Sequence, residues 1–388
     1  MLKFTTIGTF ALMLTLAACN ERGSAIRSRS EPTKVSATAP ARTSGSPSSY
    51  ADIVDRVSPA VVTIRSARRL RTPQQFPFMI DPFRRFFDED APRGSRRAPE
   101  PVQRGLGSGV VVRADGHILT NHHVIDGADE IKVDLNDHRT YSAKLVGSDP
   151  PSDLAVLSVS AGDLPALALA DSNGVRIGDI CLALGNPMGI GQTVTSGIVS
   201  AKGRWTGLSN GTFEDFLQTD APINQGNSGG ALVSMTGELI GINSQILSPT
   251  GGNIGIGFAI PSNMAKSVMD QLLRSGKVRR GQLGITVQQI DSDVASRAGV
   301  KDTHGVLVES VTPGGPADKA GIRPGNVVTS VDGSTIEDLN AFRNRIASTP
   351  PGSTVNLTIV RNGRPQQLTV KLGELKLDSA RADQMPSQ

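Results

Sequence analysis

Cysteine, histidine and aromatic residues are scarce in this chain. Its 388 residues include two Cys, five His and one Trp, and aromatic residues make up only 4%. Two cysteines cannot build a disulfide framework, and no Cys/His set has the spacing of metal ligands. We therefore expect no metal and no cofactor. Cys181 lies in an apolar, strand-like run, which favours a buried small hydrophobic residue over a nucleophile.

Long hydrophobic runs are also lacking, apart from one at the start of the chain. Lys3 precedes an apolar run over 4–16 that is too short to span a bilayer as a mature helix. Residues 1–19 therefore read as a signal peptide for export. The run ends in Leu16-Ala17-Ala18-Cys19, which resembles a bacterial lipobox, so we expect lipid on Cys19. An ordinary cleaved signal is the alternative.

Excess positive charge is confined to the first part of the chain. Residues 1–104 carry 17 Lys and Arg against 9 Asp and Glu, whereas the rest carries 23 against 27. Residues 20–49 are rich in Ser, Pro and Arg, which is typical of a flexible linker. The excess Arg lies in low-complexity stretches such as 27–42 and 93–104, which read as solvated linkers, so we do not expect nucleic acid as a partner.

Folded sequence is expected from residue 50 onward. Ala51 to Val57 has helical spacing, and a first strand follows over 60–64. Residues 68–104 then form a long inserted loop that holds five of the eleven Phe residues. We expect this loop to dock on another chain or to fold over its own surface.

Glycine is frequent in residues 105–388, which hold 38 of the 42 glycines. Between residues 107 and 260, short β-type runs recur at spacings near 8–15 residues, which predicts a sandwich or barrel. A helix over 261–275 ends at Gly276 and closes a domain over 50–276. A second domain over 281–375 has short strands around the segments 292–298 and 317–320 and a helix over 336–347, and residues 376–388 form a tail.

The most informative segment for chemistry runs from Asp220 to Gly230. Ser228 sits there in a tight loop framed by glycines, before an apolar strand. Glycines let the backbone turn so that amide N–H groups, foremost those of Gly226 and Ser228, point together beside the hydroxyl. We expect the oxyanion hole over Gly226, Asn227 and Ser228; a plain turn is the alternative.

A serine hydroxyl becomes a strong nucleophile only when a base takes its proton and a carboxylate orients that base. His122 and His123 follow an apolar strand at a turn, and either could be the base. Asp153 stands at the entrance to an apolar strand, where a half-buried acid needs a partner. The chain order is then His, Asp, Ser.

These motifs resemble, in order, those of the HtrA (Deg) family of bacterial envelope serine proteases. The matching segments include Gly107-Ser108-Gly109, Thr120 to Val124, Asp149 to Leu157, Leu184 to Pro187, Gly226 to Gly230 and Gly255 to Pro261. The resemblance covers about residues 50–375 and implies a mainly β fold, with a chymotrypsin-like (trypsin-like) double β-barrel protease domain followed by a PDZ domain. It assigns His123 as base, Asp153 as orienting carboxylate and Ser228 as nucleophile. It also implies a homotrimer or larger oligomer in the periplasm.

Substrate specificity follows from the residues near Ser228. In chymotrypsin-like proteases an acid six residues before the nucleophile selects Lys or Arg, whereas this chain has Pro222. We therefore expect an apolar pocket that prefers Val, Ala or other small aliphatic residues, and a free strand edge at 244–247 for an extended substrate. The residues expected to bind substrate are Pro222, Ile223, Asn224, Ser244, Gln245, Ile246 and Ile256.

Gly281 to Ile285 resembles the carboxylate-binding loop of PDZ domains. Residues 320–333 match their central strands, and only one such domain is recognised. The loop Gln282, Leu283, Gly284 and Ile285 is expected to bind hydrophobic C-termini of peptides. A domain that merely spaces or stabilises the protease is the alternative.

Together these features predict an ATP-independent serine endopeptidase that degrades unfolded or misfolded envelope proteins through an acyl-enzyme. The rival hypothesis is a PDZ-dependent chaperone or stress sensor in which proteolysis is latent or minor.

Overall fold

The computed structural model describes residues 49–69, 102–186, 191–207, 213–248, 252–300 and 303–376. Cys19, the predicted signal peptide, the predicted linker and most of the predicted Phe-rich loop lie outside these ranges. No helix in the described part is long and apolar enough to cross a membrane.

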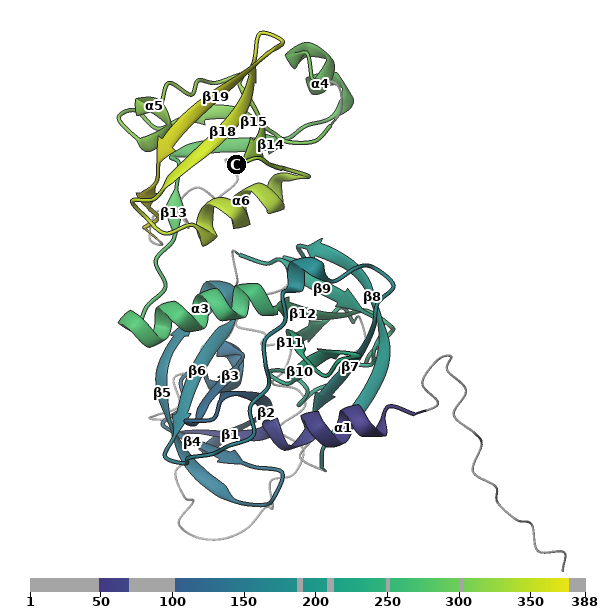
Figure 1. The fold of residues 1–388 in the computed structure, drawn as a ribbon. Coiled ribbons are helices and arrows are strands. Elements are labelled where there is room, and N and C mark those ends of the chain that lie inside the picture. Colours follow the sequence, from purple (N-terminus) through teal and green to yellow (C-terminus); the bar gives the residue numbers. More distant parts are fainter. Residues whose placement is uncertain are drawn as a thin grey trace, which may run out of the picture. The chain divides into compact units, whose positions relative to one another are not determined.

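The first half of the domain over residues 50–276 is a closed six-stranded barrel (Figure 1). Helix α1 (Ala51–Val57) precedes it, as the spacing predicts. The strands are β1 (Val61–Arg69), β2 (Val102–Arg113), β3 (His117–Thr120), β4 (Glu130–Asp134), β5 (Thr140–Asp149) and β6 (Leu154–Val159). Their order around the barrel is β1-β2-β3-β6-β5-β4. The short helix α2 (His122–Ile125) follows β3 directly.

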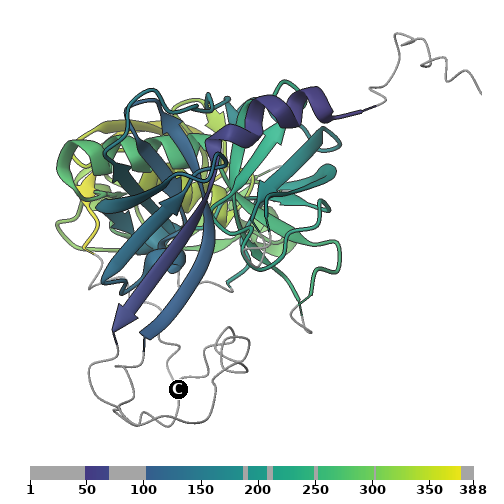
Figure 2. The same ribbon diagram turned by 90° about the horizontal axis from the view of Figure 1, so that it is seen from below.

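Strands β1 and β2 reach further into the expected loop 68–104 than its composition suggests. They pair antiparallel over nine residue pairs, from Val61 with Val110 to Arg69 with Val102, and lie side by side in Figure 2. Paired backbone hydrogen bonds continue the ladder through polar, Arg-rich sequence, because ladder pairing depends on the backbone and only weakly on residue type. Residues 68, 69 and 102–104, which the prediction assigns to the loop, therefore belong to paired strands.

The second half is another closed barrel, with strand order β10-β11-β12-β9-β8-β7. Its strands are β7 (Ile180–Gly185), β8 (Thr193–Arg204), β9 (Phe216–Thr219), β10 (Ala231–Ser234), β11 (Leu239–Ile246) and β12 (Gly257–Pro261). The predicted barrel-type β structure is confirmed for both halves. Helix α3 (Ser262–Ser275) follows and ends at Gly276, whose φ of +68° suits glycine.

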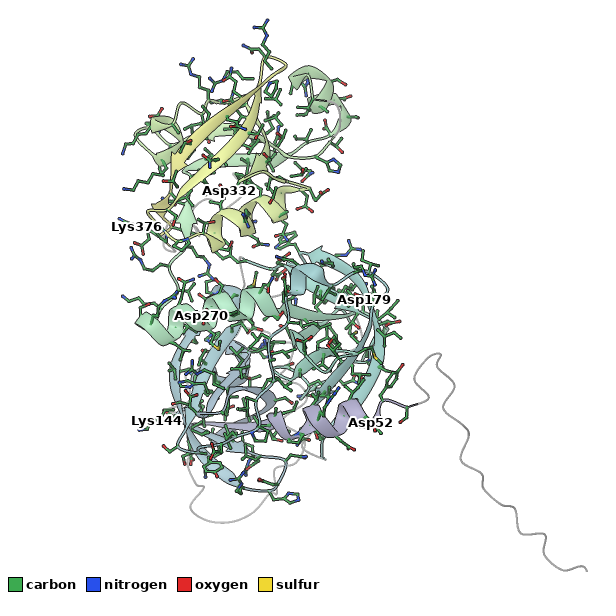
Figure 3. The ribbon with its side chains drawn as sticks, viewed as in Figure 1. Asp52, Lys144, Asp179, Asp270, Asp332 and Lys376 are labelled. Carbon is green, nitrogen blue, oxygen red and sulfur yellow. The ribbon has the colours of Figure 1, made fainter. Side chains whose placement is uncertain are left out.

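Both barrels are filled by aliphatic side chains, and strands such as β6, β7, β11 and β12 are buried along most of their length. Ile64, Leu119, Leu157, Leu184 and Ile242 are fully buried in one cluster that includes residues of both barrels. Charged side chains such as Asp52, Lys144 and Asp179 lie on the outside (Figure 3). This shared core holds the two barrels together, and the segments that connect their strands carry the candidate site.

The PDZ domain has its own core and a mixed architecture. Its main sheet has the order β14 (Ile285–Gln289), β15 (Val306–Val311), β16 (Val327–Val331), β18 (Thr354–Arg361) and β19 (Arg364–Lys371), with β17 (Ser334–Thr335) paired to β16. The short strands β13 (Gly281–Gln282) and β20 (Gly373–Glu374) pair separately. The helices are α4 (Ser292–Ala298), α5 (Pro316–Lys319) and α6 (Leu339–Ser348). Strand β14 forms one edge of the main sheet, and no other strand pairs with that edge among the residues that the structure describes.

Candidate active site

The structure brings His123 and Asp153 into direct contact in the first barrel. His123 lies on α2, and Asp153 lies immediately before β6. The Nδ1 atom of His123 is 2.8 Å from Oδ2 and 3.0 Å from Oδ1 of Asp153. The His123 backbone N–H donates to Oδ1 at 3.0 Å, so the carboxylate holds both the ring and the backbone of the histidine.

Asp153 is placed by an uncommon backbone conformation. Its φ is +54°, a left-handed value that an Asp adopts more readily than most residues. The turn 150–152 precedes Asp153. The carbonyl of Asp153 accepts hydrogen bonds from the His122 N–H at 3.1 Å and from Asn121 Nδ2 at 3.0 Å. These contacts fasten the acid to the loop that carries the histidines.

Burial and charge act in opposite directions on this pair. Burial alone would lower the pKa of His123, but the attraction of the Asp153 carboxylate and its hydrogen bond together raise that pKa above its usual value. Burial alone would raise the pKa of Asp153, but the positive charge and hydrogen bonds of His123 outweigh it and lower that pKa. Asp153 therefore stays ionised and stabilises a protonated His123.

His122 points to a different acid. Its Nε2 atom is 3.5 Å from Oδ1 of Asp126, and its Nδ1 atom is buried without a hydrogen-bond partner. Of the two adjacent histidine rings, only that of His123 contacts the Asp153 carboxylate, a choice that sequence reasoning left open.

Ser228 comes from the second barrel, and its hydroxyl donates to the Ser244 carbonyl at 2.9 Å. Among the described residues it makes no hydrogen bond to His123. Ser244 Oγ in turn donates to Asp153 Oδ2 at 3.1 Å. Ser244 thus connects the predicted nucleophile and the predicted carboxylate, a role that sequence analysis missed because it placed Ser244 only on the substrate strand.

A β-bulge explains how Ser244 can make both contacts. The register of β11 against β12 shifts between Asn243 and Gln245, so Ser244 has no partner in that ladder. A bulge turns a side chain away from the regular alternation of a strand. Pairing of β11 with β10 ends at Ile242, which leaves the other edge of 244–246 without a strand partner in the described structure.

The segment 226–228 presents two unused N–H groups. The carbonyls of Gly226, Asn227 and Ser228 are bound by Ser108 Oγ at 2.6 Å, the Gly230 N–H at 2.9 Å and the Ser108 N–H at 2.8 Å. In the described chain, neither the Gly226 nor the Ser228 N–H donates to another protein atom. The Asn227 N–H donates to the Asn224 carbonyl at 3.0 Å. The N–H of Asn227, which is also expected in the oxyanion hole, is therefore hydrogen-bonded within the loop itself.

Glycine is required at residue 229. Its φ is +84°, and a Cβ atom there would lie 2.1 Å from the Ser108 carbonyl oxygen and 2.4 Å from Thr120 Oγ1. No side chain fits between these atoms, so Gly229 lets the Ser228 loop approach the first barrel closely.

The expected substrate-binding residues differ in burial: Ile223 and Ser244 are buried, Gln245, Ile246 and Ile256 are half-buried, and Pro222 and Asn224 are exposed. Ile223 is buried, and a Cβ atom on Gly257 would lie 2.9 Å from its side chain. Pro222 is exposed, and its carbonyl accepts a hydrogen bond from Thr195 Oγ1 at 2.8 Å. Asn253 donates to the Ile223 carbonyl at 3.0 Å and to Asn224 Oδ1 at 3.3 Å, which ties the loop after β11 to the loop before Ser228.

Cys181 is fully buried, so its predicted role as a small core residue is confirmed. Burial raises the pKa of its thiol to about 11, and its Sγ atom lies 3.2 Å from Thr219 Oγ1. A thiol with this pKa is protonated near neutral pH and is a poor nucleophile.

In the PDZ domain, the predicted carboxylate-binding loop precedes the edge strand β14. Gly284 has a φ of +73°, and its carbonyl accepts the Thr312 N–H at 2.8 Å. The Leu283 carbonyl accepts the Ala317 N–H at 2.9 Å, and the Leu283 side chain is buried in the domain core. Both carbonyls therefore point into the domain. Leu339, the first residue of α6, donates its N–H to Gln289 Oε1 at 2.9 Å and so links α6 to β14.

Comparison with known families matches both domains of this chain. Residues 107–242 match the trypsin-like peptidase domain, and residues 281–372 match the PDZ domain.

Curated relatives match over most of the chain. It is 45% identical over 339 residues to the periplasmic pH-dependent serine endoprotease DegQ of Escherichia coli K12, which covers 86% of this chain and 72% of DegQ. It is 42% identical over 393 residues to the periplasmic serine endoprotease DegP of the same strain, covering 96% of this chain and 80% of DegP. Among solved structures, the HtrA-type protease AlgW with a decapeptide matches with a TM-score of 0.65 and 44% identity, covering 84% of this chain and 99% of AlgW.

The contact between His123 and Asp153 predicts how His123 titrates. In a Ser228→Ala background, NMR titration of the imidazole should give a pKa above the usual value of about 6.5, because the carboxylate favours the charged ring. Asp153→Asn removes that charge but leaves the burial, so the pKa should fall. Asp126→Asn, which affects the partner of His122, serves as the matched control and should leave His123 unchanged. An unchanged His123 pKa in Asp153→Asn would contradict this interpretation.

Proposed function

This chain belongs to the HtrA (Deg) family of serine proteases, and we propose that it degrades unfolded or misfolded envelope proteins without ATP. It is a serine endopeptidase with a trypsin-like domain. The observation that carries the proposal is the bonded pair of His123 and Asp153 on one barrel, joined through Ser244 to Ser228 on the other.

We propose that the reaction proceeds through an acyl-enzyme on Ser228. His123 takes the proton of the Ser228 hydroxyl as its Oγ attacks the substrate carbonyl, and Asp153 stabilises the imidazolium that forms. The N–H groups of Gly226 and Ser228 stabilise the oxyanion. His123 then gives the proton to the leaving amine, and water releases the acyl group by the reverse path, which restores the hydroxyl.

An unfolded chain supplies what the site requires. We propose that an extended substrate pairs with the open edge at 244–246 and places a small aliphatic side chain near Ile223 and Ile256. The absence of an acid at Pro222 supports an apolar preference. Contacts of this kind discriminate by only about 1–3 kcal/mol, so we expect loose selection among aliphatic residues.

A second candidate function is a chaperone or sensor whose proteolysis is latent. The resting hydrogen bond of Ser228 to the Ser244 carbonyl favours it, because the hydroxyl must rotate before His123 can take its proton. This hydrogen bond therefore supports an enzyme whose Ser228 hydroxyl is not yet oriented toward its base.

Casein degradation tests the proposal against this second candidate. Residues 49–388 should cleave unfolded casein, and Ser228→Ala should lose at least about 1,000-fold in kcat because the nucleophile is gone. Cleavage-site mapping should find mostly Val, Ala or other small aliphatic residues before the cut. If the unmodified protein leaves casein intact even with hydrophobic-tailed peptides added, the protease proposal fails; a majority of cuts after Lys or Arg would refute the pocket assignment.

We propose that the PDZ domain captures hydrophobic C-termini at the loop 282–285. The open edge of β14 and the inward carbonyls of Leu283 and Gly284 support strand addition with a carboxylate held by backbone N–H groups.

Binding of a labelled peptide by Ser228→Ala protein tests this capture, because that variant cannot cleave the probe. A peptide with an apolar C-terminal residue should bind at least about tenfold more tightly than its C-terminally amidated form, since amidation removes the charge. Equal affinities for the two peptides would mean that the loop does not hold a carboxylate.

The names of the relatives support a periplasmic location. We propose in addition that lipid on Cys19 anchors the protein to a membrane, on the strength of the lipobox-like segment. Cys19→Ala should then release the protein into the soluble fraction of the envelope. An unmodified protein that is already soluble would point to an ordinary cleaved signal.

We also propose that the chain works as a homotrimer or larger oligomer, which the family resemblance implies. The molar mass of residues 49–388 in solution is the measurement that checks it.

A further inference from the structure

Ser108 is the fully buried residue of β2 that contacts the Ser228 loop of the other barrel. Its hydroxyl donates to the Gly226 carbonyl at 2.6 Å and accepts the Asn186 N–H at 2.9 Å. Its own N–H donates to the Ser228 carbonyl at 2.8 Å, and its carbonyl accepts Thr120 Oγ1 at 2.7 Å. All polar groups of Ser108 are therefore used, and two of them bind residues that carry the unused N–H groups.

These contacts fix the peptide groups around the candidate oxyanion hole. The Gly226 carbonyl is drawn toward Ser108 on one side of Asn227, and the Ser228 carbonyl is drawn toward Ser108 on the other. The carbonyl between them, that of Asn227, is held by the Gly230 N–H at 2.9 Å. The Asn227 carbonyl shares a rigid peptide group with the Ser228 N–H, so its hydrogen bond fixes that donor directly. The Gly226 carbonyl fixes the peptide group that follows Gly226, which leaves the Gly226 N–H to turn only about the two dihedral angles of Gly226 itself.

The Ser108 hydroxyl has its largest effect at Gly226, because a glycine restrains its own backbone dihedral angles only weakly. Gly226 has a φ of +94°, and a glycine can adopt backbone conformations that other residues cannot. Without the Ser108 hydroxyl, the buried Gly226 carbonyl and the Asn186 N–H both lose a partner, and the segment is free to seek other donors. Such rearrangements move the Gly226 N–H away from the point where the oxyanion forms.

We propose that Ser108 is a positioning residue for the oxyanion hole. Its hydroxyl holds the Gly226 carbonyl so that the N–H groups of Gly226 and Ser228 are oriented before substrate arrives. Ser108 does not touch substrate. This inference rests on the proposed protease function and adds to it a residue on β2, in the barrel opposite the nucleophile.

Oriented donors act on the transition state more than on the bound substrate. Ser108→Ala should therefore lower kcat on a peptide substrate by about 10- to 100-fold, since loss of one oxyanion donor costs about 100- to 1,000-fold and here the donor is misplaced, not removed. KM should stay within about threefold. The His123 pKa should not move, because Ser108 makes no contact with His123 or Asp153.

Ser262→Ala is the matched control. Ser262 is also fully buried and also donates its hydroxyl to a backbone carbonyl, that of Ala170 at 2.7 Å, but it lies at the start of α3. Its substitution should leave kcat within about twofold. Ser108→Cys is the second variant, because a thiol keeps nearly the same volume and donates only weakly. It should lower kcat in the same direction even if the alanine variant fails to fold.

The outcomes separate this inference from the proposed function. If the unmodified protein cleaves and the folded Ser108→Ala or Ser108→Cys variant keeps full kcat, Ser108 does not position the hole. The same holds if only KM changes or if Ser262→Ala loses as much kcat as Ser108→Ala. An inactive unmodified protein overturns the proposed function, and this inference with it.

Discussion

Hydrogen bonds that cross from one barrel to the other determine whether this site can work. His123 and Asp153 belong to the first barrel, whereas Ser228 and Ser244 belong to the second. Ser244 reaches Asp153, and Ser108 reaches the Ser228 loop. A shift of about 1 Å between the barrels would break these bonds and misplace the reacting groups, and such errors cost about 100-fold in rate. The shared aliphatic core, which includes Leu184 and Ile242, supplies the rigidity that this arrangement needs.

Local sequence was sufficient for the parts of the fold that depend on local chemistry. The helix Ala51–Val57 has the bounds that its spacing predicts, and short strands recur between residues 107 and 260 as the turn spacing predicts. The ends of β1 and β2 were missed because their pairing satisfies the backbone of polar residues, which periodicity does not detect. Closure of the strands into two barrels could not be read from spacing alone, and it came from the family resemblance.

In the candidate site, too, some residues could be predicted from local sequence and others could not. Asp153 could be singled out because an acid at the entrance to an apolar strand needs a partner. The double contact of Ser244 depends on a bulge in β11, and the use of the Asn227 N–H depends on a turn that begins at Asn224. Neither feature has a signal in the order of residues, because both arise from pairing between segments far apart or from the direction of a single peptide group.

The long pairing of β1 with β2 has a consequence for the insertion that joins them. Arg69 and Val102 are paired across the ladder, so the ends of the segment 70–101 are held together by the barrel itself. The entropy of closing a loop grows only with the logarithm of its length, and each doubling costs about 0.6 kcal/mol. The free energy of folding of the barrel therefore depends only weakly on the length of this segment. Ser108, further along the same strand, is therefore kept in register with the Ser228 loop by the β1–β2 ladder and not by the segment 70–101.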